Sequence, residues 1–438
     1  MAFGALQSST AKVFGIGLLA LLMLIPLAQV QGLIGERSEL REHAVWTIAQ
    51  GWGGKQQFGG PVLAIPKRAR STTTNGWVDS TELLLPDQLD IAGTLAPELR
   101  HYGIYSTPVY TGQFKLSGQF LARDIAALGN PEATYFWDRA ELRVPISDEH
   151  GIRRAGTLHF AGADYEFGPG SGGVGDSNAI AVPVDASKLS VSAEKYAFDF
   201  ELTLAGTQDL NLLPLARRTQ VSLSAPWPDP SFRGAFLPAE RSVDAQGFQA
   251  KWQVLDLNRS FGQHWLQDDF HAKPAFAAAA FGVGLYQPVS IYQQNERAGK
   301  YGVLFIALTF VAFFLFEVLK KLRVHPVQYL LIGLALTTFY VVLLALSEQI
   351  GFAWSYLVAA TLVVLLVGGY AAAVLRTRRS GVLLGATMAL VYGLLYGLVV
   401  SEQYSLLMGS VALLAVVALL MYLTRRVDWY AATAAKPA

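Results

Sequence analysis

Six long apolar runs interrupt this chain, and five of them lie in its C-terminal third. Each is close to the ~20 residues that an α-helix needs to span the hydrocarbon core of a bilayer. The runs cover residues 13–34, 301–319, 326–346, 352–375, 382–400 and 404–423. They predict an N-terminal membrane helix and a C-terminal bundle of five. We expect the first helix to be retained, because it is longer than the ~7–15 residue core of a secretory signal.

The charges beside the runs predict which way each helix points. Lys and Arg in short loops stay on the cytoplasmic side of a membrane. The two short loops at the opposite ends of the bundle contain Glu348 and Glu402 instead. We therefore expect both termini in the cytoplasm. Residues 1–35 would form a cytoplasmic tail and the first membrane helix, residues 36–300 an extracytoplasmic domain, and residues 424–438 a second cytoplasmic tail. The positive residues that follow the second, fourth and sixth runs are Lys320, Lys321, Arg323, Arg376, Arg378, Arg379, Arg425 and Arg426.

Composition supports a membrane protein with one large domain outside the lipid. The chain has 438 residues, mean hydropathy is +0.34, and 15% of residues are charged. A net charge of +1 predicts no nucleic-acid partner. There is no cysteine, so the outer domain depends on its own hydrophobic core rather than on disulfides.

The segment 36–300 has the pattern of β-strands. Phe198, Phe200, Leu202 and Leu204 alternate with polar residues, and similar period-two stretches occur near residues 114–120, 142–146 and 248–254. Turn residues rich in Gly and Pro separate the stretches, which favours an antiparallel sandwich. We expect the glycine-rich stretch 168–175 to divide the domain into two halves. The predicted class is α+β: an anchor helix, a β-rich domain and a helical bundle at residues 301–423.

Residues 289–301 predict a short helix that enters the bundle, because Glu296 and Lys300 have the favourable i,i+4 spacing. Within the bundle, Gly381, Gly385, Ala389, Gly393 and Gly397 form a stripe of small residues. Such a stripe allows close helix packing, either within the chain or between two copies, so the oligomeric state stays open.

Candidate chemistry within the bundle rests on one residue, Glu317. An ionisable residue inside an apolar run suggests a proton relay or an ion site. Lys320 and Lys321 follow within one helical turn, however, and pairing with them at the membrane surface would be a purely structural role. Glu348 and Glu402 are interpreted as turn charges, with a paired acidic lip on the outer face as the alternative.

Outside the bundle, His264, Asp268, Asp269 and His271 lie close together in the sequence. Their spacing matches no established metal motif, so a solvated turn is favoured and we expect no metal and no cofactor. No GxSxG elbow or cysteine nucleophile is present, so the sequence predicts no catalytic residues. The rigid turn with Trp227, Pro228 and Pro230 is a candidate recognition site, although a Trp that closes the sandwich edge is favoured.

Several segments resemble the CreD family of inner-membrane cell envelope integrity proteins. The resemblance covers residues 60–370 and rests on the segments 60–66, 227–238 with Arg241, 305–319, 323–331 and 346–352, and on Pro288, Tyr292, Gln293, Glu296 and Arg297. It implies a Gram-negative inner-membrane protein produced in a two-component envelope-stress or β-lactam response, with effects on envelope integrity and colicin tolerance. It implies no reaction and supplies no catalytic residues.

Three functional hypotheses remain at this point. The first is a non-enzymatic protein whose outer domain binds an envelope protein or a peptidoglycan component, with the lipid bilayer around its bundle. The second is a transporter or channel, for which Glu317, Tyr340, Tyr392 and Tyr396 are the polar residues within the bundle. The third is a membrane enzyme that acts on lipid or peptidoglycan precursors, for which the His264 to His271 cluster is the only matching feature.

Overall fold

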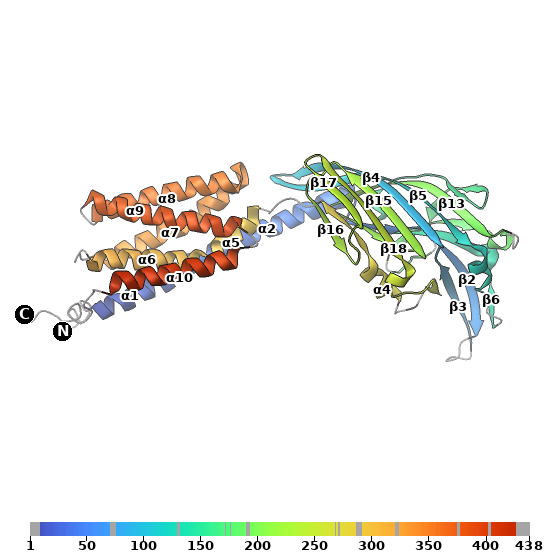
Figure 1. Ribbon diagram of the computed structural model, residues 1–438, viewed down its shortest axis with the longest axis horizontal. Helices are drawn as coiled ribbons and strands as arrows, with labels where there is room; N and C mark the ends of the chain where they lie inside the picture. The colour runs from blue at the N-terminus through green and yellow to red at the C-terminus, as the bar shows by residue number, and fades with distance from the viewer. Residues whose placement is uncertain are drawn as a thin grey trace, which may run out of the picture. The chain divides into compact units, whose positions relative to one another are not determined.

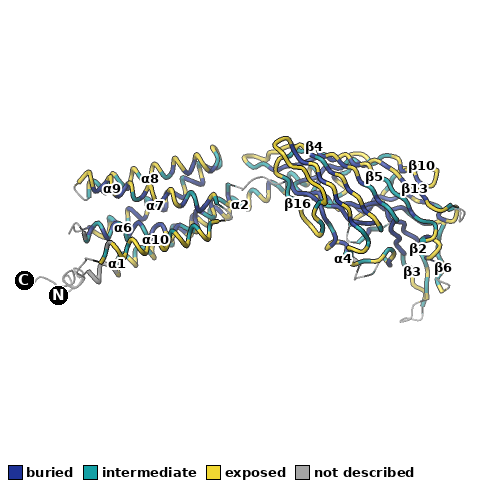
Figure 2. Tube along the Cα trace, in the orientation of Figure 1, coloured by how far each residue is buried: buried dark blue, intermediate teal, exposed yellow. Residues whose placement is uncertain are grey.

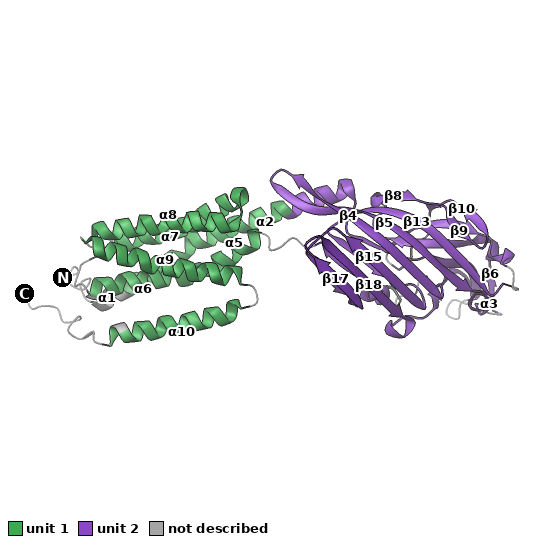
Figure 3. Ribbon diagram, turned by 45° about the horizontal axis from the view of Figure 1, so that its top comes forward, with its two compact units in different colours: residues 1–41, 289–438 green, residues 42–288 purple. Residues whose placement is uncertain are grey.

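A computed structural model describes residues 9–70, 76–128, 132–170, 172–175, 177–189, 193–267, 269, 272–285, 291–319, 324–374, 377–401 and 404–425. The chain forms two compact units (Figure 3). The helical unit comprises Met1–Arg41 and Val289–Ala438, and the β unit comprises Glu42–Pro288. Both boundaries lie inside the expected domain range of 36–300, because the first helix extends further than its apolar run and the short helix before the bundle belongs to the helical unit.

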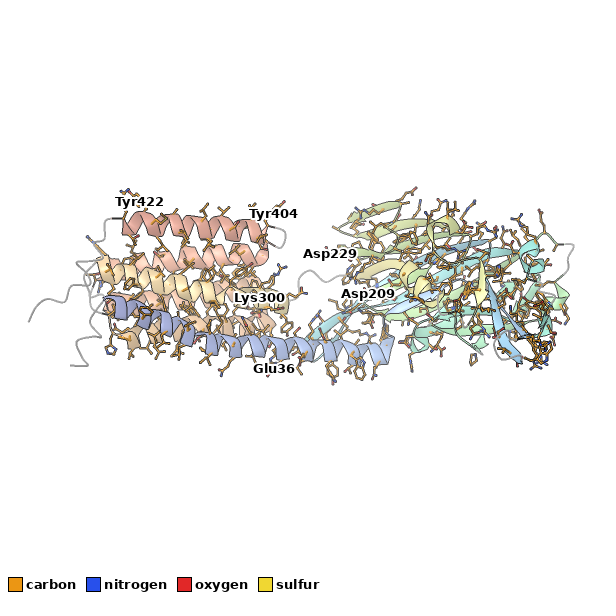
Figure 4. The ribbon with its side chains drawn as sticks, turned by 90° about the horizontal axis from the view of Figure 1, so that it is seen from below. Glu36, Asp209, Asp229, Lys300, Tyr404 and Tyr422 are labelled. Carbon is orange, nitrogen blue, oxygen red and sulfur yellow. The ribbon has the colours of Figure 1, made fainter. Side chains whose placement is uncertain are left out.

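The helical unit confirms the expected set of apolar helices. Five described helical segments are long and apolar enough to cross a membrane: Phe14–Trp52, which includes most of α1 and all of α2, and Pro326–Ile350, Phe352–Val374, Arg378–Val400 and Ser405–Tyr422. A sixth span results if α5 and α6, which meet at a bend of 44°, cross together. The helices are α1 (Ser9–Leu22), α2 (Leu24–Trp52), α5 (Ile291–Lys300), α6 (Gly302–Leu319), α7 (Pro326–Ile350), α8 (Phe352–Val374), α9 (Arg378–Val400) and α10 (Ser405–Thr424). Figure 4 marks Tyr404 and Tyr422 near the two ends of α10.

Helix α2 continues well beyond the apolar run that predicted it. Its polar second half, from Glu36 to Gln50, consists mainly of residues that are compatible with a helix and contains no proline. The helix ends at Trp52, because Gly53 has φ +128° and a Cβ there would lie 2.7 Å from the Ala205 carbonyl oxygen. Only glycine fits this position without strain.

The β unit is a sandwich of two mainly antiparallel sheets (Figure 1). The first has the order β16-β20-β14-β1-β7-β2-β3-β19, with β6, β11 and β12 attached, and the second has the order β10-β9-β13-β5-β4-β15-β18-β17, with β8 attached. The pairs β1–β14 and β4–β15 run parallel, which the alternating pattern did not predict.

The strands of the first sheet are β1 (Gln56–Gly59), β2 (Val62–Arg70), β3 (Trp77–Leu84), β6 (Ala133–Tyr135), β7 (Ala140–Ile146), β11 (Gly168–Pro169), β12 (Asn178–Val184), β14 (Asp209–Leu213), β16 (Pro230–Gly234), β19 (His264–Leu266) and β20 (Phe281–Leu285). Those of the second are β4 (Gln88–Tyr102), β5 (Tyr105–Leu121), β8 (Ile152–Ala155), β9 (Leu158–Phe160), β10 (Ala163–Tyr165), β13 (Lys195–Thr207), β15 (Arg218–Ala225), β17 (Glu240–Asp244) and β18 (Gly247–Leu255). Two short helices, α3 (Ala122–Ala126) and α4 (Ala272–Ala279), complete the unit.

One core joins the two sheets. Phe58 of β1 and Phe114 of β5 lie in the same buried cluster, with their ring centroids 4.7 Å apart. Buried and exposed positions alternate along β13, as its sequence predicts (Figure 2). The expected division into halves at residues 168–175 is wrong, because β5 pairs with β13 across that stretch in an unbroken register from Leu121↔Lys195 to Val109↔Thr207.

Candidate functional site at one end of the helical unit

Polar side chains gather where α2, α5 and α7 meet. Glu348 lies in the last turn of α7, and its side chain is only 10% exposed. The Tyr292 hydroxyl on α5 donates a hydrogen bond of 3.2 Å to Glu348 Oε1, and Arg37 Nε on α2 lies 3.8 Å from the same oxygen. The predicted turn charge is therefore held between a hydroxyl and a guanidinium.

Asn295 and Ser347 extend this group toward the interior. Asn295 is 1% exposed, and its amide nitrogen donates to Ser347 Oγ at 2.9 Å and to the Ile291 carbonyl at 2.7 Å. Its amide oxygen is buried without a hydrogen-bond partner among the described residues. We call Arg37, Tyr292, Asn295, Ser347 and Glu348 the α2–α5–α7 polar cluster.

The cluster can hold helices in place, and its chemistry does not resemble that of a hydrolytic site. Within the described residues, no three His, Cys, Asp or Glu side chains converge as a metal site would require. The partners of Glu348 are a tyrosine hydroxyl and a guanidinium. A hydrolytic site would instead have a nucleophile hydrogen-bonded to a base, with a third group that orients the base. Glu402, the other half of the hypothetical acidic lip, lies outside the described residues.

Glu317 lies near the C-terminal end of α6, and its surroundings differ from those of a surface ion pair. The residue is only 3% exposed. Its carboxylate accepts hydrogen bonds from the Val324 backbone N–H at 3.1 Å and from the Tyr329 hydroxyl at 2.9 Å. Lys320 and Lys321, the partners expected from the sequence, lie outside the described residues. The observed bonds tie the end of α6 to the start of α7.

The turn at Trp227 lies at the edge of the sandwich core. Trp227 is partly buried and packs against the cluster shared by the two sheets, whereas Pro228 is exposed. Pro230 begins β16, where it pairs with Leu285 of β20. The three residues therefore connect the second sheet to the first, and the Trp ring is only partly available to a partner.

A shallow groove runs along β15 on the solvent-facing side of the second sheet. Its floor is made of short side chains, Ala92 and Thr94 of β4 and Ser222 and Ser224 of β15. Long side chains rise on both sides: Lys115 of β5 opposes Ala92, and Lys251 of β18 opposes Ser222. Two hollows, of about 380 and 360 Å³, lie along this floor. We call this feature the β15 groove.

Charge in the β15 groove is mixed. Glu240 of β17 and Lys251 form an ion pair at 2.8 Å. The hydrogen bond and charge of Lys251 lower the pKa of Glu240, so this carboxylate is ionised at neutral pH. Asp90 and Lys115 add one charge of each sign. Such a lining suits an elongated polar ligand that carries hydrogen-bonding groups.

Glu82 is the centre of a buried ionic network that the sequence pattern did not predict. The Glu82 carboxylate accepts hydrogen bonds of 2.7 Å from Lys67 Nζ and from the Tyr135 hydroxyl, and His264 Nδ1 lies 3.2 Å away. Burial acts to raise the pKa of Glu82, but these hydrogen bonds and positive charges together lower it. Glu82 and buried Leu84 lie on the same face of β3, because side chains two residues apart in a strand point the same way. A charged residue at an inward-facing position of the strand was therefore the feature of the sequence that could have indicated this network.

Among the residues of the hypothetical metal cluster, His264 therefore contacts Glu82. Asp268 and His271 lie outside the described residues. Asp269 is described, and its backbone N–H donates to the Leu266 carbonyl.

Comparison with known proteins agrees with this architecture. The family model described as "Inner membrane protein CreD" matches residues 8–430. The chain is 33% identical over 417 residues to inner membrane protein CreD of Escherichia coli (strain K12), covering 94% of this chain and 91% of that protein. A structural match to native leukotriene A4 hydrolase from Saccharomyces cerevisiae has a TM-score of 0.20 and 12% identity, with 39% of this chain and 27% of that chain covered, which is too low to support an argument. The chain, with its apolar helices and inserted β unit, belongs to the CreD family of inner membrane proteins.

Proposed function

We propose that this protein serves envelope integrity without catalysis, and that its β unit binds another envelope component outside the cytoplasm while the helices anchor it in the inner membrane. The β15 groove is the observation that supports binding most directly. Its floor of Ala, Ser and Thr and its walls of Lys and Glu form a polar surface across neighbouring strands. An envelope protein segment and a peptidoglycan strand are both elongated and rich in hydrogen-bonding groups. We include in this proposal the wider roles that the family resemblance implies, namely roles in envelope stress, in the β-lactam response and in colicin tolerance.

The proposed topology places both termini in the cytoplasm and the β unit in the periplasm. Reporter fusions near Asp90, Glu348 and Glu402 should give periplasmic signals, because no Lys or Arg lies in the two short loops. Fusions near Arg378 and Arg426 should give cytoplasmic signals, as should one near Arg323. A cytoplasmic signal at Asp90 would contradict the topology and, with it, the location of the binding surface.

Site-specific photo-crosslinking in cells tests binding at the β15 groove. A photoreactive amino acid at Ser222, on the groove floor, should capture a discrete partner. The same amino acid at Glu201, which is exposed on β13 of the same sheet, should not. Equal capture from both positions would place the partner elsewhere, and absence of any adduct from Ser222 would contradict binding in the groove.

Charge reversal gives a second test with a matched control. Lys115→Glu replaces the positive charge on the β5 side of the groove with a negative one near Asp90, and it should weaken both the crosslink and envelope integrity, measured as resistance of cells to detergent. Lys195→Glu makes the same change at an exposed position at the start of β13 and should leave both unchanged. If both variants retain the crosslink and resistance, the groove is not the binding site.

The transporter hypothesis has weaker support from the described part of the helical unit. The Tyr356 hydroxyl donates to the Tyr392 carbonyl oxygen at 2.7 Å, and Tyr340 is buried among aromatic rings. Glu317 is engaged in the α6–α7 connection. These groups hold helices together rather than forming a continuous polar path. Uptake or efflux that fails in Glu317→Gln while the protein remains folded would favour the transporter.

A further inference from the structure

Helices α8 and α9 are close at one end and spread apart at the other, as Figures 1 and 3 show. At the end where α9 begins, Gly368 of α8 faces Gly381 and Gly385 of α9. A Cβ on Gly368 would lie 3.5 Å from the Gly381 carbonyl oxygen and from the Gly385 Cα. The first part of the small-residue stripe is thus a packing seam within the chain.

Aromatic rings separate the helices at the other end. The rings of Tyr356 and Tyr396 lie 5.1 Å apart, and Phe352 stacks on Tyr396 at 6.5 Å. Between the two helices, a groove of about 560 Å³ opens to the outside of the unit. We call it the α8–α9 groove. Ala360 of α8 and Ala389 and Gly393 of α9 contribute its small side chains.

The location of the α8–α9 groove selects hydrocarbon as its surroundings. Both α8 and α9 are candidate membrane spans, so their exposed sides face lipid rather than water. The lining contains no Asp, Glu, Lys, Arg or His. Helix α10 does not fill the groove, since it packs on α9 elsewhere, with Met408 Cε 3.1 Å from the position of a Cβ on Gly397.

The length of the α8–α9 groove matches one leaflet of a bilayer. Its lining on α8 runs from Ala353 to Leu365, twelve residue steps or about 18 Å at ~1.5 Å per residue. One leaflet of a bilayer provides about 15 Å, half of the ~30 Å hydrocarbon core. The lining therefore has the length that an acyl chain needs to follow it from the headgroup level to the middle of the bilayer.

The groove also has the polarity of a lipid. Trp354 lies in the first turn of α8 and Tyr396 in the last turns of α9, so both lie at the same end of the groove. Tyr and Trp prefer the level of the headgroups, where their polar atoms can bond to water or to lipid esters. The Tyr396 hydroxyl makes no hydrogen bond with another described residue and is free to donate to an ester carbonyl. Leu365 and Ala389 mark the apolar end.

We propose that the α8–α9 groove binds one acyl chain of a phospholipid, with the glycerol region at Trp354 and Tyr396 and the chain end near Leu365. The proposal goes beyond the binding function of the β unit. Contacts on two sides give a chain in the groove more dispersion energy than a chain against a single convex helix. In the proposed topology, the bound lipid belongs to the periplasmic leaflet.

The test uses the full-length protein in nanodiscs of phosphatidylethanolamine and phosphatidylglycerol that contain a phospholipid with a diazirine in its acyl chain. After irradiation, mass spectrometry should find adducts concentrated on α8 and α9. Gly393→Leu should reduce these adducts to the level of other lipid-facing helices, because a side chain there enters the groove and a Cβ meets nothing within 4 Å. Gly369→Leu is the matched control. Gly369 lies on α8, is exposed, meets nothing within 4 Å and does not line the groove.

Both glycine variants increase helix propensity by a similar amount, so a folding effect should be shared. Ala389→Leu gives a second variant that fills the groove. Equal labelling of wild type, Gly393→Leu and Ala389→Leu would overturn the proposal and indicate an ordinary lipid annulus. A crosslink from the groove to α10 of a second copy would also overturn it. A diazirine on a free fatty acid should label the groove less than the phospholipid does if the Tyr396 end contacts the glycerol ester, and equal labelling would overturn that placement.

Discussion

Removal of the Glu317 carboxylate should destabilise the helical unit far more than loss of a surface charge. Glu317 is 3% exposed, and its two donors are also buried: Tyr329 is 2% exposed and Val324 is 5% exposed. Glu317→Ala leaves the Tyr329 hydroxyl and the Val324 N–H without this acceptor. Each buried group left unsatisfied costs ~1–3 kcal/mol, so the sum is roughly 2–6 kcal/mol.

Glu317→Gln keeps one acceptor oxygen but points an amide NH2 toward the second donor. We expect it to cost about 1–3 kcal/mol, less than the alanine variant. Tyr329→Phe removes one hydrogen bond to a charged group and should cost ~1.5–3 kcal/mol. Because Glu317 and Tyr329 are partners, the double variant should lose less stability than the sum of the two single variants.

The assay is the midpoint of thermal unfolding of the purified protein in detergent, read by loss of the monodisperse peak in gel filtration. Val303→Ala, at a 47% exposed position of the same helix, is the control and should shift the midpoint little. A Glu317→Ala variant that melts at the wild-type temperature would refute this structural role of Glu317. Normal melting together with loss of the envelope phenotype would instead support a transport role for Glu317.

Three further predictions concern the β unit. Trp227→Ala should lower the melting temperature. Its cost in unfolding free energy should be about half the ~3–5 kcal/mol of a fully buried Trp, because the ring is only partly buried at the edge of the core. An unchanged melting temperature together with loss of the crosslink from Ser222 would show that Trp227 anchors the partner instead. Glu82→Gln should lower the free energy of unfolding at neutral pH. The difference in stability between this variant and wild type should narrow as pH falls below 4.5, because a carboxylate with a lowered pKa contributes stability that is lost when it is protonated. A difference in stability that is the same at pH 7 and pH 3 would contradict this. Gly53→Ala should reduce the yield of folded protein, because its Cβ would clash with the Ala205 carbonyl oxygen. Gly51→Ala, which lies in open space within α2, should instead stabilise the protein by up to ~1 kcal/mol. Equal yields and melting temperatures for the two variants would disprove the requirement for glycine at position 53.

Sequence alone determined the features that depend on local pattern. The apolar runs at 326–346, 352–375 and 382–400 match α7, α8 and α9 to within a few residues, because a membrane helix satisfies its own backbone hydrogen bonds and needs only a continuous apolar length. The alternation at Phe198 to Leu204 likewise predicted β13 and its buried face. The family resemblance, carried by motifs along much of the chain, is confirmed by the comparisons.

Tertiary structure decided which of these elements meet. The pairing of β5 with β13, across a glycine-rich stretch, depends on contacts between residues 74 (Leu121 and Lys195) to 98 (Val109 and Thr207) positions apart, which no local period encodes. The burial of Glu317 and Glu82 depends on Tyr329 and Tyr135 reaching them from other elements. The β15 groove and the α8–α9 groove arise where short side chains of one element lie beside long side chains of its neighbours. Local sequence determined helices and strands because their hydrogen bonds and hydrophobic periods are short-range, whereas burial, pairing and grooves depend on residues brought together only by the fold.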